Sequence, residues 1–183
     1  MLSWGFALLI FVALGAAVWL FNGLVRSRNL VASAWADIDV QLQRRHDLVP
    51  RLVKVVKAAA SHEQQTLESV IATRDAAVRA SQVSDKGQRE EALQESINQL
   101  LMLVEDYPDL KAGDNYSELS HDLVDIEDKL QYARRFYNGA TREYNTRVER
   151  FPDQLVASSF GFSQAQYFQA QADARAPAEV NLQ

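Results

Sequence analysis

The chain begins with 25 residues that carry no charged side chain, and this stretch limits its fold more than any other feature. As a helix, the 24 residues 2–25 would extend about 36 Å, at about 1.5 Å per residue. The hydrocarbon core of a bilayer is about 30 Å thick. Trp4 near one end, and Trp19 and Phe21 near the other, suit the interfacial positions of membrane aromatics. We expect residues 1–25 to form a single-pass transmembrane anchor.

Two other interpretations of this segment fit less well. A cleaved signal peptide needs a basic start, a shorter apolar region and a small-residue cleavage site. The chain has no early Lys or Arg, and its small residues, Ala13 to Ala17, lie inside the apolar run. A buried globular helix would seldom extend over 25 uncharged residues.

Charge is distributed unevenly after the anchor. Residues 26–60 contain seven Lys or Arg and three Asp, whereas the rest of the chain contains 12 basic and 21 acidic residues. Basic residues favour the cytoplasmic side of a membrane. We therefore expect the N-terminus outside and the remaining chain in the cytoplasm. The opposite orientation is the alternative. The net charge of −5 argues against nucleic acid as a partner.

Apolar residues then recur with a 4-3 spacing that is typical of a helix with one coiled-coil-like seam. The seam positions are Val31, Trp35, Ile38, Leu42, Arg45, Val49, Leu52, Val56 and Ala59. Only Arg45 breaks the apolar pattern. Pro50 removes a backbone donor, and since the pattern resumes in phase, we expect a kink rather than an end. The apolar face continues to Val78, and a break is expected at about residues 81–87.

Two more long helices follow from the same periodicity. One is expected at about residues 88–106, and the other from Tyr116 to Val148 with Asp114 as a candidate N-cap. A short fourth helix could start at Pro152 and end before Gly161. The predicted fold class is all-α: a transmembrane helix (1–25), then an antiparallel bundle of three, possibly four, helices (26–162). Residues 163–183 are expected to be a flexible tail.

Several segments together resemble the LemA family of bacterial membrane proteins. They are "FNGLVRSRN", "AWADIDVQLQRRHDLVPRLVKVVK", "HEQQTLESV", "EDYPDLKA", "YARRFYNGATREYNTRVERFP" and "FGF". The match covers nearly all of residues 21–162 in order. Phe21 and Arg51 depart from the family pattern, where Tyr and Asn are common. The resemblance implies a short anchor in the inner membrane of a bacterial cell, with a helical bundle in the cytoplasm or, as the alternative, on the periplasmic side. It implies no reaction.

No catalytic or metal-binding motif is evident. The segment "HEQQT" has a zinc-protease-like start at His62, but Thr66 stands where the second His ligand is needed. Zero cysteines exclude disulfides and thiolate sites. We therefore expect no enzyme activity, no metal and no cofactor.

The charged cluster Arg44, Arg45 and Asp47 raises a different question, because Arg45 occupies a seam position. An unpaired buried charge costs several kcal/mol. Arg45 could extend out of a loosely packed end, or it could pair with an acidic group such as Glu127 or Asp106. Such a pair would set helix register or partner choice.

A Tyr-Asn pair occurs twice, seven residues apart, at Tyr137-Asn138 and Tyr144-Asn145. The tyrosines fall on the predicted seam. They could pack in the core with each hydroxyl reaching a partner, or they could form a recognition surface for another chain.

These observations favour a membrane-anchored, non-catalytic interaction or scaffold protein. A regulatory subunit or adaptor of a membrane enzyme, such as a protease or signalling system, is the alternative. Residues 105–128 carry nine acidic side chains and one lysine, complementary to the basic residues 26–60. Because the seam also exceeds what one subunit easily covers, we expect a homo-oligomer with the helix after the anchor in the contact, or another membrane protein as partner.

Overall fold

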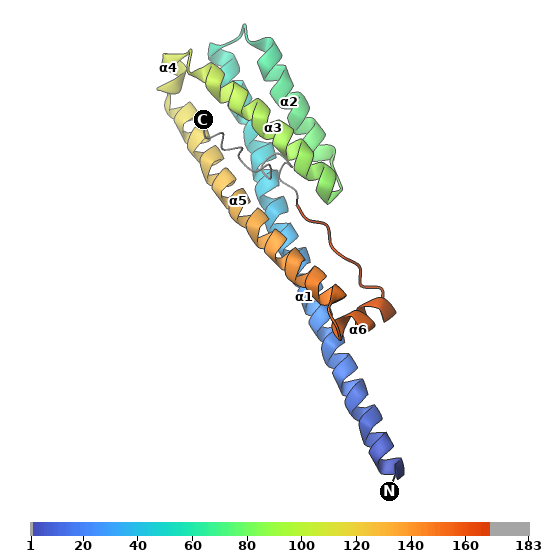
Figure 1. Ribbon diagram of the computed structural model, residues 1–183. Helices are drawn as coiled ribbons and strands as arrows, with labels where there is room; N and C mark the ends of the chain where they lie inside the picture. The colour runs from blue at the N-terminus through green and yellow to red at the C-terminus, as the bar shows by residue number, and fades with distance from the viewer. Residues whose placement is uncertain (1, 169–183) are drawn as a thin grey trace, which may run out of the picture. The chain divides into compact units, whose positions relative to one another are not determined.

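The computed structural model describes residues 2–168, in which six helices and no strand are found (Figure 1). The predicted all-α class is therefore confirmed. The helices are α1 (Leu2–Ala59), α2 (Gln64–Arg79), α3 (Val83–Val104), α4 (Pro108–Lys111), α5 (Asp114–Glu149) and α6 (Asp153–Ser159). The described chain divides into two compact units. Unit 1 contains residues 2–38 and 133–166, and unit 2 contains residues 39–132 and 167–168.

The N-terminal part of α1 is long and apolar enough to cross a membrane. Only 6% of its most apolar stretch is buried against the rest of the chain. The core helix of a globular protein would instead be mostly covered. The exposed large side chains include Trp4, Phe11 and Trp19.

The seam predicted along α1 is present. In unit 1 it buries Val31 and Ile38, and in unit 2 it buries Leu42, Val49, Leu52 and Val56. Trp35 is half-buried and Ala59 is exposed. Since the chain's own residues cover this seam, the expectation that α1 uses it to contact another subunit is not supported by the fold.

Two predicted helix boundaries are wrong. The apolar pattern predicts a continuous face from the seam to Val78, but α1 ends at Ala59 and α2 begins at Gln64 after a tight turn. No Gly or Pro marks this turn, whose sequence "AAASHE" contains helix formers. The apolar period continues because α2 buries its own stripe, including Leu67 and Val70. The second break is short, so α3 starts at Val83, earlier than expected.

Unit 2 is built around the helix pair α2 and α3, which lie side by side (Figure 1). On α3, the residues Leu93, Ile97 and Leu100 are buried in one stripe. Thr73 of α2 and Ser96 of α3 lie 2.7 Å apart, oxygen to oxygen, within this contact. The pairing of two polar hydroxyls satisfies groups that packing removes from water.

The C-terminal helices follow the sequence more closely. Helix α5 starts at Asp114 itself, which is the first helical residue instead of the cap before it. The short helix α6 starts directly after Pro152, as expected. Gly161 adopts φ 71° after its end, and the Phe162 N–H donates to the Ala157 carbonyl at 3.0 Å. This is a Schellman cap, which favours glycine at the left-handed position.

Candidate functional site

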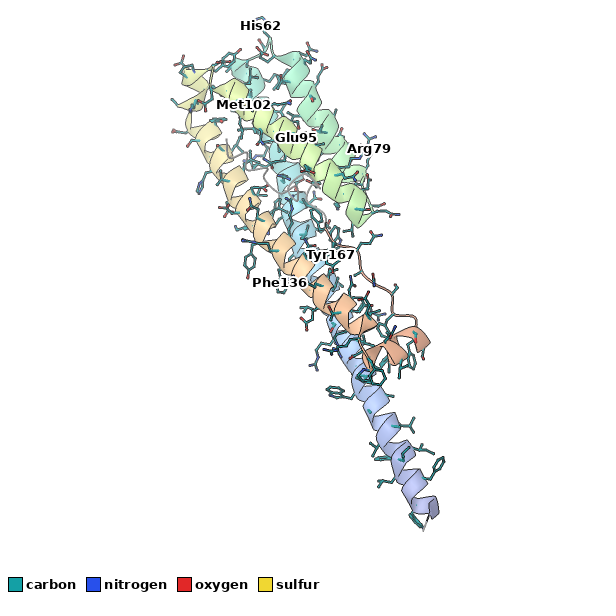
Figure 2. The ribbon with its side chains drawn as sticks, in the orientation of Figure 1. His62, Arg79, Glu95, Met102, Phe136 and Tyr167 are labelled. Carbon is teal, nitrogen blue, oxygen red and sulfur yellow. The ribbon has the colours of Figure 1, made fainter. Side chains whose placement is uncertain are left out.

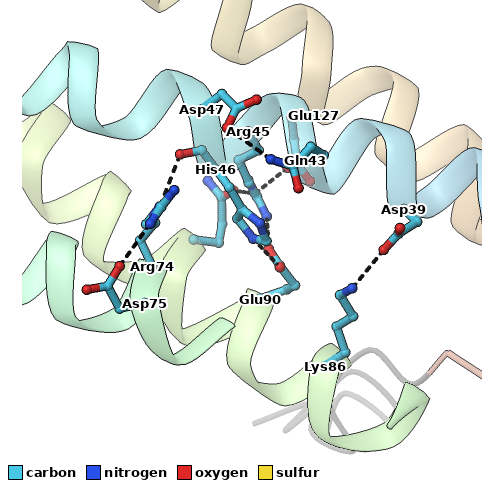
Figure 3. Close-up of polar contacts among 11 residues, drawn as sticks. Asp39, Gln43, Arg45, His46, Asp47, Arg74, Asp75, Lys86, Glu90 and Glu127 are labelled. Atoms are coloured by element: carbon cyan, nitrogen blue, oxygen red, sulfur yellow. Dashed lines mark hydrogen bonds and ion pairs between the residues drawn. The ribbon is translucent and has the colours of Figure 1, made fainter. Parts of the chain in front are cut away.

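The most unusual group in the structure is the side chain of Arg45, which is buried in unit 2 with 2% of its surface exposed. Its Nη1 lies 3.3 Å from Oε2 of Glu90, and its Nη2 lies 2.7 Å from Oε2 of Glu127 (Figure 3). Nη2 also donates to Oε1 of Gln94. The predicted pairing of Arg45 with Glu127 is confirmed, whereas Asp106 is exposed.

Glu90 is fully buried, and both of its oxygens are engaged. Oε2 faces Arg45, and Oε1 lies 2.6 Å from Nε2 of His46, which is also buried. With Nε2 protonated, His46 donates this hydrogen bond. The carboxylate therefore has two donors on consecutive residues of α1, and a buried charge needs such compensation.

This Arg45 network, which consists of Arg45, His46, Glu90, Gln94 and Glu127, joins three helices. Arg45 and His46 come from α1, Glu90 and Gln94 lie one turn apart on α3, and Glu127 comes from α5. Removing one partner from a buried pair costs about 3–5 kcal/mol because the other charge is left uncompensated. The network therefore disfavours any other register of these helices.

Sequence reasoning missed Glu90, although a signal was present. Glu90 precedes Leu93 by three residues and Ile97 by seven, so it occupies a position of the α3 seam. Arg45 breaks the α1 seam in the same way. Two opposite charges, each at a seam position of a different helix, predict a buried pair.

Pro50 lies within α1 and does not end it. Because proline has no N–H, the carbonyl of residue 46 loses its usual helical donor. The structure replaces that donor with a side chain from α2: Nε of Arg74 donates to the His46 carbonyl at 3.1 Å (Figure 3). Nη1 of Arg74 lies 2.9 Å from Oδ1 of Asp75. Arg74 thus compensates for the proline.

The remaining residues of the charged cluster lie at the surface. Arg44 and Asp47 are exposed, and Asp47 accepts a hydrogen bond from Gln43 at 3.0 Å. Together with Leu48, Arg51, Asp122, Asp125 and Ile126, these two residues line a groove of about 330 Å³ between α1 and α5. The groove carries both signs of charge and so offers a polar contact surface.

The tyrosine–asparagine pairs have partners inside the chain. The hydroxyls of Tyr137 and Tyr144 donate to the carbonyls of Gln166 and Ser163, at 2.7 and 2.9 Å. Asn145 forms two hydrogen bonds with the backbone of Ala165, at 3.0 and 2.8 Å. Residues 163–166 were expected to belong to a flexible tail. These hydrogen bonds instead hold them against α5. Residues 169–183 lie outside the described part.

The residues of the two Tyr-Asn pairs are removed from water to different degrees, and Asn138 is half-buried. Burial raises the pKa of the Tyr137 hydroxyl above the usual tyrosine range. Burial likewise raises the pKa of Tyr144, and the positive charge of Arg28 offsets part of this rise. Both phenols therefore remain protonated and able to donate at neutral pH. Tyr137 also packs against Trp35, with ring centroids 5.4 Å apart.

The arrangement of these side chains favours a structural role over a catalytic or metal-binding one. Within residues 2–168, no group of three or more His, Cys, Asp or Glu is placed to hold a metal ion. Of the histidines, His62 is exposed at the turn after α1 (Figure 2). His46 has a covered ring whose Nε2 is occupied by Glu90. In this structure a substrate would have no access to the Glu90 carboxylate.

Comparison with known families agrees with this architecture. The sequence model of the LemA family matches residues 34–182, which is most of the chain. The chain belongs to the LemA family. The match includes every residue of the Arg45 network, together with Pro50, Arg74 and both Tyr-Asn pairs.

Similar curated proteins include three described as magnetosome proteins. Magnetosome proteins MamQ 2 and MamQ 1 of Paramagnetospirillum magneticum are each 25% identical to this LemA-family chain over 175 residues. Magnetosome protein MamQ of Magnetospirillum gryphiswaldense is 23% identical over 174 residues. Each match covers 81% of this chain, which spans 64% of the length of each relative.

The compensation of Pro50 by Arg74 can be tested with a double-mutant cycle. Arg74→Met leaves the His46 carbonyl without a donor, so we expect a loss of about 1–3 kcal/mol in the free energy of unfolding. Pro50→Ala restores a backbone N–H at position 50, and in that background Arg74→Met should cost much less. The measurement is denaturant unfolding of the detergent-solubilised protein, followed by circular dichroism.

Arg79→Met is the matched control, because Arg79 is exposed at the end of the same helix. It should change the free energy of unfolding by no more than about 0.5 kcal/mol. An equal cost of Arg74→Met with and without Pro50 would contradict the compensation.

Proposed function

We propose that this protein is a membrane-anchored, non-catalytic helical scaffold that holds further copies of itself, or a partner protein, at the bilayer. The observation that carries the proposal is the start of α1, where a long apolar stretch is only 6% buried. Burial of apolar surface contributes about 25 cal/mol per Å². A helix with Trp4, Phe11 and Trp19 exposed is far more stable in a bilayer than in water.

The family supports the same role. LemA membership agrees with an anchor followed by a helical bundle. The relatives named magnetosome proteins suggest a role at a cellular structure rather than in a soluble reaction. The buried Arg45 network also fits a rigid scaffold, because its charges are used to hold helices together.

We propose the bacterial inner membrane as the location, with the N-terminus outside and the bundle in the cytoplasm. Arg26 and Arg28 directly follow the apolar segment, and basic residues favour the cytoplasmic side. Reporter fusions at Gln183 test this orientation. A reporter that works only in the cytoplasm should give a signal. A reporter that works only outside the cytoplasm should give none. The reverse result would place the bundle on the periplasmic side.

Self-association is supported by exposed apolar side chains that the bundle leaves uncovered. In unit 2 these include Met102 on α3 and Val124 and Tyr132 on α5. A membrane anchor also confines all copies to one surface, which raises their effective concentration. Because the α1 seam is already covered, we propose that the outer surfaces of α3 and α5 form the contact.

We expect the full-length protein in mild detergent to have a protein mass above that of one 20.6 kDa subunit. Multi-angle light scattering that separates protein from detergent gives this mass directly. Tyr132→Glu should lower the mass, since a charge at an apolar contact is disfavoured. Arg135→Glu, at an exposed charged position of the same helix, is the control. A single-subunit mass at every concentration would contradict self-association.

A second candidate, an adaptor or regulatory subunit of a membrane enzyme, is favoured by one observation. A groove of about 610 Å³ lies between the end of α1 and α2 in unit 2, where Val53, Leu67 and Ile71 provide apolar lining. Lys57, Glu68 and Arg79 lie in the same lining. Such a groove suits apolar side chains from a partner protein. A single-subunit mass in the light-scattering experiment would favour this candidate.

A further inference from the structure

Unit 1 holds the short helix α6 against the end of the apolar part of α1. The ring centroid of Phe21 lies 5.0 Å from that of Phe160 and 5.7 Å from that of Phe162, in edge-on geometry. Phe21 precedes the first charged residue, Arg26, by five positions. The residues around α6 are therefore at the level where the apolar segment ends.

An ion pair fixes this position. Nε and Nη2 of Arg147 on α5 donate to Oδ1 of Asp153 on α6, at 3.2 and 2.7 Å, and Nη1 donates to Oγ of Ser27 on α1, at 3.1 Å. Gly23 leaves room for the guanidinium, since a Cβ there would lie 2.9 Å from Cζ of Arg147. One side chain thus ties α5 and α6 to residues 23–27 of α1.

Three large apolar side chains around α6 are not covered by the chain. Phe151 is 74% exposed, Leu155 is 61% exposed and Phe160 is 65% exposed. We call these three residues the α6 patch. The three residues lie within ten positions of one another in the sequence, in α6 or beside it. Exposed apolar residues concentrated in one segment can mark an interaction site.

Three polar side chains near the α6 patch already have partners inside the chain. The hydroxyls of Ser158 and Ser159 donate to the Leu155 carbonyl, at 3.1 and 2.8 Å. Asp153 is buried in its pair with Arg147. The charged group that residues 150–162 expose is Arg150. Besides its apolar side chains, the segment therefore exposes one positive charge and the uncharged amide of Gln154.

We propose that the α6 patch inserts into the boundary between headgroups and acyl chains of the same bilayer that the anchor crosses. This inference rests on the anchor proposed above. Two observations favour lipid over a second protein chain. The patch adjoins the membrane-spanning segment through the contact of Phe160 with Phe21. Arg26, Arg28 and Arg150 are exposed and suit the phosphates of the headgroups.

The α6 patch would be a second point of contact with the membrane, in addition to the spanning helix. Interfacial segments bury their apolar face roughly 5–10 Å deep in the headgroup region. A single spanning helix can tilt and rotate, whereas a helix with a rigidly attached interfacial segment has a fixed rotation relative to the membrane. The anchor and α6 together would then fix the orientation of the scaffold relative to the bilayer.

Tryptophan fluorescence in lipid nanodiscs tests the proposal. The full-length background has Trp4, Trp19 and Trp35 replaced by Phe, and Leu155→Trp or Phe160→Trp adds one reporter. Lipids brominated near the top of the acyl chains quench tryptophans at that depth. We expect both reporters to lose fluorescence in brominated nanodiscs relative to unbrominated ones.

Phe136→Trp is the matched control. Phe136 is an exposed aromatic residue of α5 in unit 1 (Figure 2). It precedes Arg147 by 11 residues, or roughly 16 Å of helix, so its fluorescence should be unchanged. A variant that keeps only Trp19 tests the anchor itself and should be quenched.

The outcomes separate the two proposals. Quenching at Trp19 without quenching at positions 155 and 160 would overturn the α6 inference and leave the anchor intact. Absence of quenching at Trp19 would overturn the anchor, and the inference with it. Equal quenching at position 136 would also contradict the proposal, because the depth would then not be specific to α6. Protection of positions 155 and 160 from a water-soluble quencher without bromine quenching would point to a protein contact and overturn it.

Discussion

The buried charge of Arg45 constrains how unit 2 can be assembled. Arg45 occupies a seam position of α1, so the guanidinium enters the core when the helix packs. Desolvating a charge without a partner costs several kcal/mol. Glu90 on α3 and Glu127 on α5 provide the opposite charges. Sliding either helix by one turn, about 5.4 Å, would separate the partners and leave charges buried alone. Apolar packing drives the association of these helices, and the network selects one register.

Much of this arrangement follows from periodicity in the sequence. The α1 seam, the extent of α5 and the end of α6 at Gly161 were all predictable, because apolar spacing and glycine stereochemistry act locally. Arg45 could be recognised as the break in a seam, and charge alone made Glu127 and Asp106 its candidate partners without deciding between them. These predictions succeed because each depends on residues that are neighbours on one helix or on a simple charge match.

Other features depend on contacts between distant segments, which the local pattern does not encode. The turn between α1 and α2 lies in a run of helix formers, and only the packing of α2 back on the chain explains it. The role of Arg74 requires knowing that α2 returns beside Pro50. Residues 163–166 look polar and unstructured, yet Tyr144 and Asn145 bind their backbone. Hydrogen-bond partners of this kind are determined by tertiary structure rather than by the secondary-structure propensity of a segment.

The central claim is that the buried charge of Arg45 fixes the helix assembly, and the free energy of unfolding of Arg45→Met tests it most directly. Denaturant unfolding of the full-length protein in detergent should show a loss of about 3–5 kcal/mol, since Glu90 then stays buried without the guanidinium charge of Arg45. Arg44→Met, at the exposed neighbouring position, should change the value by no more than about 0.5 kcal/mol. The double variant Arg45→Met/Glu90→Gln should recover part of the loss, because it removes the unpaired carboxylate. An Arg45→Met protein that unfolds at the same denaturant concentration as the wild type would contradict the claim.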